Sequence, residues 1–230
     1  MTAVAAGLPF GGNGTSEKEM AVGGVEGPRA AMTLLDWRRR VFALYAAIRA
    51  EPDPVAAHAL WCSTRAELLT THSDSPVPAA ERARYPGPDV APYDPAFRFE
   101  AALDTVVAPV HLDVATGTDG VVAFDRVGRL HLPGIGDLDV WWLGSYGGGL
   151  FVPIRDALAG TETYGGGRYL LDTVKGADLG SRDGRLIIDL NFAYQPSCAY
   201  DPTWACPLAS PGNVVTAPVP VGERYRPPSG

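Results

Sequence analysis

Apolar and polar residues follow a helical period near the start of the sequence and a period of two over most of the remainder. Between Leu34 and Ala50 the apolar residues fall on one helical stripe. The members of this stripe are Trp37, Val41, Leu44, Tyr45 and Ile48. The pattern predicts a helix that stops before Pro52, because proline lacks the backbone N–H that a continuing helix needs.

A second helix is predicted directly after the first. Asp53 has the short acceptor side chain of an N-cap, and Pro54 suits the first helical position. The helix then continues to about Thr71. Its apolar residues are Val55, Ala59, Leu60, Ala66 and Leu69.

From Phe97 onward apolar and polar residues alternate, which is typical of half-buried strands. The predicted strands lie within 97–104, 110–114, 121–126, 129–132, 137–142, 150–154, 168–173, 185–192 and 214–219. No long helical pattern falls between them, which argues against a doubly wound α/β fold. The sequence therefore predicts a mainly β (α+β) protein with an N-terminal helical segment. Its antiparallel meander forms a barrel or a sandwich.

This pattern divides the chain into a tail and one domain. Residues 1–32 are rich in glycine and carry little apolar surface, so we expect a disordered N-terminal tail. Residues 33–226 form a single globular domain, with helices over about 34–71 and the β body over about 97–220. The proline-rich stretch from Ser73 to Pro95 is predicted as an ordered surface loop.

Composition and charge narrow the function classes. The 230 residues are 46% hydrophobic and carry a net charge of −7, and Arg38-Arg39-Arg40 is the one basic cluster. We therefore expect no nucleic-acid or membrane partner. The sequence has no apolar run long enough to span a bilayer and no recognisable secretory signal, so a cytoplasmic location is expected. The three cysteines fit a reducing compartment.

Candidate chemistry is concentrated in two polar segments, of which the first runs from 154 to 170. Arg155 and Arg168 can each present a donor fork to a carboxylate or phosphate, and Asp156, Tyr164 and Tyr169 accompany them. The structural alternative is that Arg155 pairs with Asp156 or Asp189 to fasten the loop. Gly165-Gly166-Gly167 matches no phosphate-binding or dinucleotide-binding pattern, so no cofactor is implied.

The second segment runs from 189 to 207 and combines acidic, amide and aromatic residues with two cysteines. Its candidate ligand-binding residues are Asp189, Asn191, Tyr194, Cys198 and Tyr200. On a strand, Asp189 and Asn191 would share one face. For Cys198 and Cys206, a disulfide, a metal site and two packed thiols all remain open, with the last favoured.

Two catalytic arrangements also remain open. Cys198 with His111 or His131 and an aspartate would make a nucleophilic site. Glu162 with Asp156 or Asp189 would make a carboxylate pair.

These residues carry a resemblance to a bacterial and archaeal family known as domain of unknown function 1684. The matching residues are Trp37, Arg155-Asp156, Gly160, 162–170, Asp189, Asn191, Ala193-Tyr194, Pro196, Cys198-Ala199-Tyr200, Cys206-Pro207, Asn213 and Gly222-Glu223. The resemblance covers about Leu34 to Tyr225, and Ile154, Leu158, Ala159 and Gln195 depart from the usual pattern. It implies no reaction, but it implies that the two polar segments act as one unit.

Three functions follow in order of preference. The first is a small-molecule-binding β domain whose arginine- and tyrosine-lined pocket holds an anionic or polyhydroxylated ligand. The alternative is a hydrolase-type enzyme that uses Cys198 or a carboxylate in the same pocket. The third is a partner-binding protein that uses the tail and the 73–95 stretch. The sequence does not indicate an oligomeric state.

Overall fold

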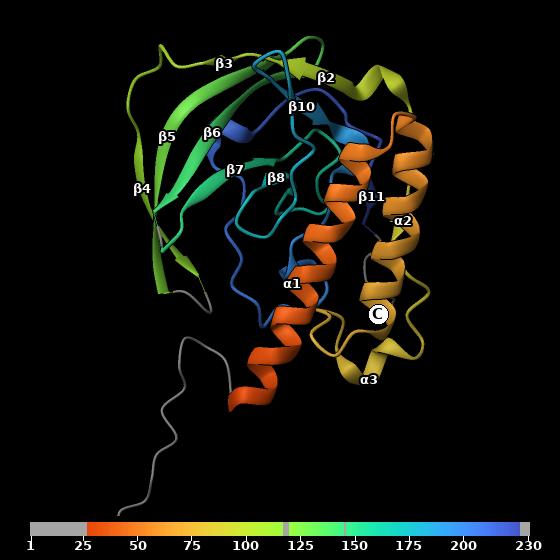
Figure 1. The fold of residues 1–230 in the computed structure, drawn as a ribbon. Coiled ribbons are helices and arrows are strands. Elements are labelled where there is room, and N and C mark those ends of the chain that lie inside the picture. The colour runs from red at the N-terminus through yellow and green to blue at the C-terminus, as the bar shows by residue number, and fades with distance from the viewer. Residues whose placement is uncertain (1–26, 117–119, 145, 226–230) are drawn as a thin grey trace, which may run out of the picture.

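The computed structural model describes residues 27–116, 120–144 and 146–225. A pair of packed helices lies on one side of the molecule and a curved antiparallel sheet on the other (Figure 1). The helices are α1 Gly27–Ala50, α2 Pro54–Thr71 and α3 Ala79–Arg82. The strands are β1 Asp89–Val90, β2 Arg98–Ala101, β3 Leu103–Asp104, β4 His111–Thr116, β5 Gly120–Leu132, β6 Gly136–Gly144, β7 Gly149–Ile154, β8 Arg168–Asp172, β9 Ser181–Arg182, β10 Arg185–Asp189 and β11 Glu223–Arg224. Short 3₁₀ turns lie at Pro95–Phe97, Leu190–Phe192, Ser197–Ala199 and Pro211–Asn213.

Helix α2 has the predicted bounds. The Asp53 carboxylate accepts a hydrogen bond from the Val55 N–H at 3.0 Å, as an N-cap should. Helix α1 ends at Ala50 as predicted but begins at Gly27, so residues 27–32 are helical rather than part of the predicted tail. Residues 29–32, Arg-Ala-Ala-Met, are good helix formers and largely exposed, so propensity rather than an apolar stripe extends the helix. The remaining tail residues, 1–26, lie outside the described residues.

The two long helices bury one face each against the β body. Leu44, Tyr45 and Ile48 are buried on α1, as the predicted stripe requires. The buried residues of α2 are Ala57, His58, Trp61, Leu68 and Leu69. Of its other apolar residues, Val55 and Leu60 are exposed. No described helix combines the length and apolar composition needed to cross a membrane.

The sheets are antiparallel, which confirms the mainly β prediction. The largest follows the order β3-β5-β6-β7-β8, and β4 also pairs with β5. A second sheet has the order β2-β10-β9, and β1 pairs with β11. The described strands β3 and β8, at the two ends of the large sheet, do not pair, so the sheet is not closed into a barrel. Its core includes Leu130, Leu138, Val140, Val152 and Ile154, each fully buried.

Strand β5 replaces two strands predicted on either side of Gly128. Its pairing with β6 is irregular between Arg126 and Gly128 but does not end there. A Cβ atom at Gly128 would lie 2.6 Å from Leu103 Cδ1, so the glycine permits a close approach of β3. The signal read as a turn is therefore a bulge within one long strand.

Three other predictions differ from the structure. Strand β10 stops at Asp189, whose carboxylate caps the turn Leu190–Phe192, so the predicted strand to Phe192 is too long. Residues 214–219 form no strand, and Val214 makes one isolated bridge to Arg155. The predicted loop 73–95 contains α3 and β1, and it buries Val77 and Ala91.

Asn213 fastens the C-terminal segment to the large sheet. Its Oδ1 accepts a hydrogen bond from Trp141 Nε1 at 2.8 Å. Its Nδ2 donates to Asp139 O at 2.8 Å and to Pro153 O at 2.9 Å. The side chain is fully buried, so these groups have no access to replacement water.

Replacing Asn213 by alanine is expected to lower the free energy of unfolding by about 3 kcal/mol, because several buried polar groups lose their partners. Urea denaturation followed by tryptophan fluorescence measures the change. Ser210→Ala is the matched control, since its hydroxyl donates only to Asn213 Oδ1 at 2.9 Å. Equal effects of the two substitutions would contradict the fastening role of Asn213.

Candidate functional site

The two polar segments singled out in the sequence lie against each other. Tyr169 N donates to Tyr194 O at 2.8 Å, and Tyr194 N donates to Tyr169 O at 3.1 Å. Farther along, the Tyr164 hydroxyl donates to Cys198 O at 3.3 Å. Backbone pairing thus extends the β8 edge onto the loop that carries the cysteines.

Arg168, one of the predicted ligand-binding residues, is fully buried, and both of its terminal nitrogens donate to the protein itself. Its Nε has no hydrogen-bond partner among the described residues. Its Nη2 donates to Val219 O at 2.8 Å, and its Nη1 donates to Val221 O and, at 3.1 Å, to Glu223 O. Asp156 Oδ1 lies 3.6 Å from Nη2. Burial lowers the pKa of Arg168 to about 10, so the guanidinium remains charged at neutral pH. It holds the C-terminal segment along β8.

Asp156 and Arg155 fasten the loop between β7 and β8. The buried Asp156 carboxylate accepts hydrogen bonds from Thr163 Oγ1 at 2.7 Å and from Val219 N at 2.9 Å. Arg155 is exposed, and its Nε donates to Gly165 O at 2.9 Å. Arg155 therefore lies on the surface and does not share a pocket with Arg168.

Asp189 and Asn191 also have structural partners. Asn191 exchanges two hydrogen bonds of 2.8 Å with the backbone of Asp94, and its Nδ2 donates to Asp189 Oδ1 at 2.7 Å. Asp189 further accepts from Tyr93 at 3.1 Å and from Arg98 at 3.2 Å. The two side chains meet, as predicted, but through a capped 3₁₀ turn rather than along a strand.

A second buried network contains a residue that the sequence pattern did not single out. Arg65 of α2 donates from Nε and Nη2 to the Glu223 carboxylate. Glu223 Oε2, which accepts from Arg65 Nη2, also accepts hydrogen bonds from Gln195 N at 2.6 Å and from the Tyr200 hydroxyl at 3.1 Å. Burial opposes the charge of Arg65, but Glu223 outweighs it and raises the arginine pKa well above its usual range. Tyr200, a predicted ligand-binding residue, thus belongs to this ion-pair network.

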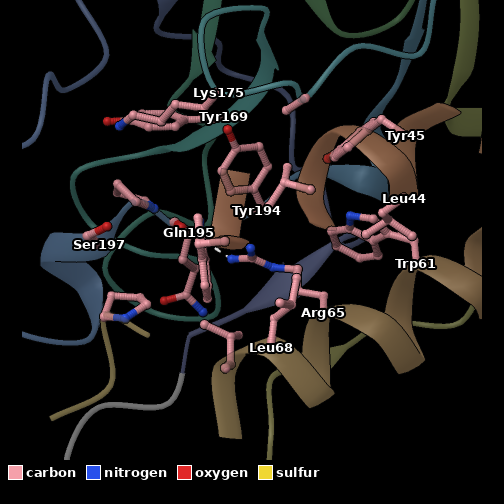
Figure 2. A pocket seen from close by; sticks show the side chains of 16 residues that line it. Leu44, Tyr45, Trp61, Arg65, Leu68, Tyr169, Lys175, Tyr194, Gln195 and Ser197 are labelled. Atoms are coloured by element: carbon pink, nitrogen blue, oxygen red, sulfur yellow. Dashed lines mark hydrogen bonds between the residues drawn. The ribbon is translucent and has the colours of Figure 1, made fainter. Parts of the chain in front are cut away.

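A small cavity of about 90 Å³ lies between the helices and the β body, beside this network. Its apolar wall is made of Trp37, Val41, Leu44, Trp61, Leu68 and Leu69. Its opposite side carries Tyr169 and Tyr194, two of the predicted residues, with Lys175 from the turn after β8 (Figure 2). Tyr45, Arg65, Gln195 and Ser197 contribute the other polar groups of the lining.

Arg65 and Tyr194, two residues of the lining, each have a side-chain donor with no hydrogen-bond partner among the described residues. Arg65 uses Nε and Nη2 in its hydrogen bonds, and its Nη1 donates to no described residue. Its guanidinium carbon lies 4.9 Å from the centre of the Tyr194 ring (Figure 2). Burial raises the pKa of Tyr194 well above its usual range, so its hydroxyl stays protonated. Burial likewise raises the pKa of Tyr45 to about 12.

The charge of the cavity differs from that of the whole chain. No aspartate or glutamate lines it, although the chain contains 26 acidic residues. Two basic residues, Arg65 and Lys175, line the cavity, and Lys175 is one of only two lysines in the sequence. The lining therefore suits a small ligand with an acceptor group and an apolar body.

The geometry does not assemble a nucleophilic site around Cys198. The described contacts of its thiol are with Tyr164 at 3.6 Å and with Cys206. Hydrogen bonding to Cys206, together with burial, raises the Cys198 pKa. Among the described residues, the side-chain partners of His111 and His131 are the surface aspartates Asp113, Asp125 and Asp137.

Comparisons with known proteins place the chain among uncharacterised relatives. The profile of a family described as "Protein of unknown function (DUF1684)" matches residues 83–224. The solution NMR structure of an uncharacterized protein from Haloarcula marismortui is 30% identical, covering 71% of this chain and 89% of that chain, with a TM-score of 0.49. No curated protein matches the sequence.

The two arginines of the first polar segment are expected to respond differently to substitution. Arg168→Met should lower the free energy of unfolding by about 3–5 kcal/mol, because buried carbonyls and Asp156 lose their partner. Arg155→Met should change stability little, since water can replace its one loop contact. Urea denaturation of both variants measures this, and equal stability of the two variants would overturn the structural assignment of Arg168.

Proposed function

The chain belongs to the DUF1684 family of proteins of unknown function, so we infer its activity from its own geometry. We propose that the protein binds a small organic anion in the cavity between α1, α2 and β8. One observation carries the proposal. In an acidic chain, a cavity lined by Arg65 and Lys175 contains no carboxylate.

The polar side of the cavity favours an anion over a neutral polyhydroxylated ligand. Arg65 Nη1, Lys175 Nζ and the Tyr194 hydroxyl have no hydrogen-bond partner among the described residues. The Glu223 carboxylate neutralises Arg65 but is itself saturated by its donors. Lys175 is exposed and adds a second positive charge to the lining, and it also interacts electrostatically with Asp172 nearby. A carboxylate would meet charge-assisted donors here, and these are stronger than neutral hydrogen bonds.

The apolar wall limits the remainder of the ligand. Trp37 and Leu44 come from α1, while Trp61, Leu68 and Leu69 come from α2, so the helical pair provides most of this surface. A cavity of about 90 Å³ accommodates only a compact group. The ligand class is therefore a short monocarboxylate with an aliphatic or small aromatic body.

A thermal-shift series with acetate, butyrate and benzoate, each beside its uncharged amide, tests the charge requirement. We expect stabilisation by at least one of these carboxylates and none by its amide, because the amide cannot pair with Lys175. Equal shifts for acid and amide would contradict the proposal. So would the absence of a shift with all three carboxylates at millimolar concentration.

Calorimetry on a Lys175→Met variant tests the position of the ligand. Loss of one charge-assisted hydrogen bond should weaken carboxylate binding by about tenfold or more. Arg38→Met is the matched control, since Arg38 is an exposed cation of α1 that does not line the cavity. Equal affinities of the Lys175 variant and the unchanged protein would place the ligand elsewhere.

A further inference from the structure

Cys198 and Cys206 lie together on the surface loop after the turn Leu190–Phe192, although eight residues separate them. The Cys198 N–H donates to Cys206 Sγ at 3.3 Å, and the two thiols share a hydrogen bond. Both side chains are half-buried and unoxidised. Neither cysteine lines the cavity, although Lys175, which does, also interacts electrostatically with Cys206.

The two sulfur atoms have different surroundings. Cys206 accepts hydrogen bonds from the Cys198 thiol and from backbone N–H groups of Cys198 and Ser197, and Lys175 adds positive charge nearby. These contacts lower the pKa of Cys206 to about 6, with the Cys198 thiol as the largest cause. The same hydrogen bond raises the pKa of Cys198. The shared hydrogen bond therefore favours negative charge on Cys206 and retains the proton on Cys198.

The third cysteine shows what an unreactive thiol looks like in this chain. Cys62 is half-buried on α2, and its sulfur lies 3.8 and 3.9 Å from the ring nitrogens of His58. Burial raises the pKa of Cys62 to about 11. Cys62 has no second thiol beside it among the described residues, which makes it an internal control.

We propose that Cys198 and Cys206 form a redox-active dithiol, in which Cys206 reacts with a peroxide and Cys198 resolves the product as a disulfide. The Cys206 thiolate attacks one peroxide oxygen, the O–O bond breaks, and hydroxide leaves, so that Cys206 becomes a sulfenic acid. Cys198 sulfur then attacks Cys206 sulfur and the S–O bond breaks. The departing hydroxide takes the Cys198 proton as water. The two sulfurs together supply the two electrons that reduce the peroxide.

Tyr164 positions the resolving cysteine. Its hydroxyl donates to Cys198 O at 3.3 Å and lies 3.6 Å from Cys198 Sγ, which fixes this residue beside Cys206. The Tyr169 hydroxyl donates to Pro207 O at 2.6 Å and holds the chain directly after Cys206. Two tyrosines of the first polar segment thus hold the two halves of the cysteine loop.

Oxidation of the reduced full-length protein with one equivalent of hydrogen peroxide tests the proposal. Intact mass spectrometry should show loss of two hydrogen atoms, and peptide mapping should join Cys198 to Cys206. Dithiothreitol should restore the original mass. In a Cys198→Ser variant the reaction should stop at a sulfenic acid on Cys206, seen as addition of one oxygen atom and trapped by dimedone. Cys62→Ser should behave as the unchanged protein.

The pH dependence of alkylation provides a second readout that needs no oxidant. Titratable groups facing Cys206 are Cys198, Tyr164, Tyr169 and Lys175. Iodoacetamide should modify Cys206 with a midpoint near pH 6. At pH 7 it should react more than about tenfold faster than Cys62.

Equal alkylation rates of Cys206 and Cys62 would overturn the proposal. So would a peroxide product that is not a Cys198–Cys206 disulfide. Circular dichroism of each variant separates loss of reactivity from loss of fold. Tyr164→Phe gives a further check, because it should slow disulfide closure without slowing the first oxidation of Cys206.

Discussion

The buried carboxylate of Glu223 connects the parts of this structure. It is fully buried at the C-terminal strand β11, and burying a charge is costly unless partners replace the lost water. Those partners come from α2 through Arg65 and from the cysteine loop through Gln195 and Tyr200. The backbone carbonyl of Glu223 is in turn held by Arg168 of β8. Helices, sheet and C-terminal segment therefore share one polar network, and the cavity lies beside it.

Much of the fold follows from local sequence. The bounds of α2 follow from Asp53, Pro54 and the residues after them, because capping chemistry acts within a few residues. Alternation of apolar residues likewise indicates β6, and short runs rich in apolar residues indicate β7 and β8. Residues 214–219 also alternate, yet their hydrogen bonds go to Arg155, Ala157 and Asp156 rather than to a strand partner. Pattern alone does not show what lies beside an extended segment.

The candidate site was harder to predict than the fold. A dense run of polar residues is typical both of ligand sites and of buried structural networks. Four of the predicted residues belong to buried structural networks: Asp156, Arg168, Asp189 and Asn191. Tyr169 and Tyr194 do line the cavity. A sequence feature could have indicated Arg65, which the sequence analysis missed. Arg65 follows Trp61 by one helical turn on the face of α2 that buries Trp61 and Leu68. A charged residue within an apolar helical stripe requires a buried partner, but the sequence does not reveal that the partner is Glu223.

The distance along the chain between these partners has a consequence for biosynthesis. Arg65 and Glu223 are 158 residues apart, so α1 and α2 leave the ribosome long before the carboxylate that neutralises α2 exists. Before Ala177, Leu179 and Phe192 have been synthesised, Trp61 of α2 also lacks the apolar surface against which it packs. Such exposed apolar faces promote aggregation. The ion pair that fastens the helical pair therefore forms only after Glu223 has been synthesised. A truncated chain that ends before Glu223 would retain its helices but would lack the ion pair between Arg65 and Glu223 that fastens α2 to the C-terminal segment.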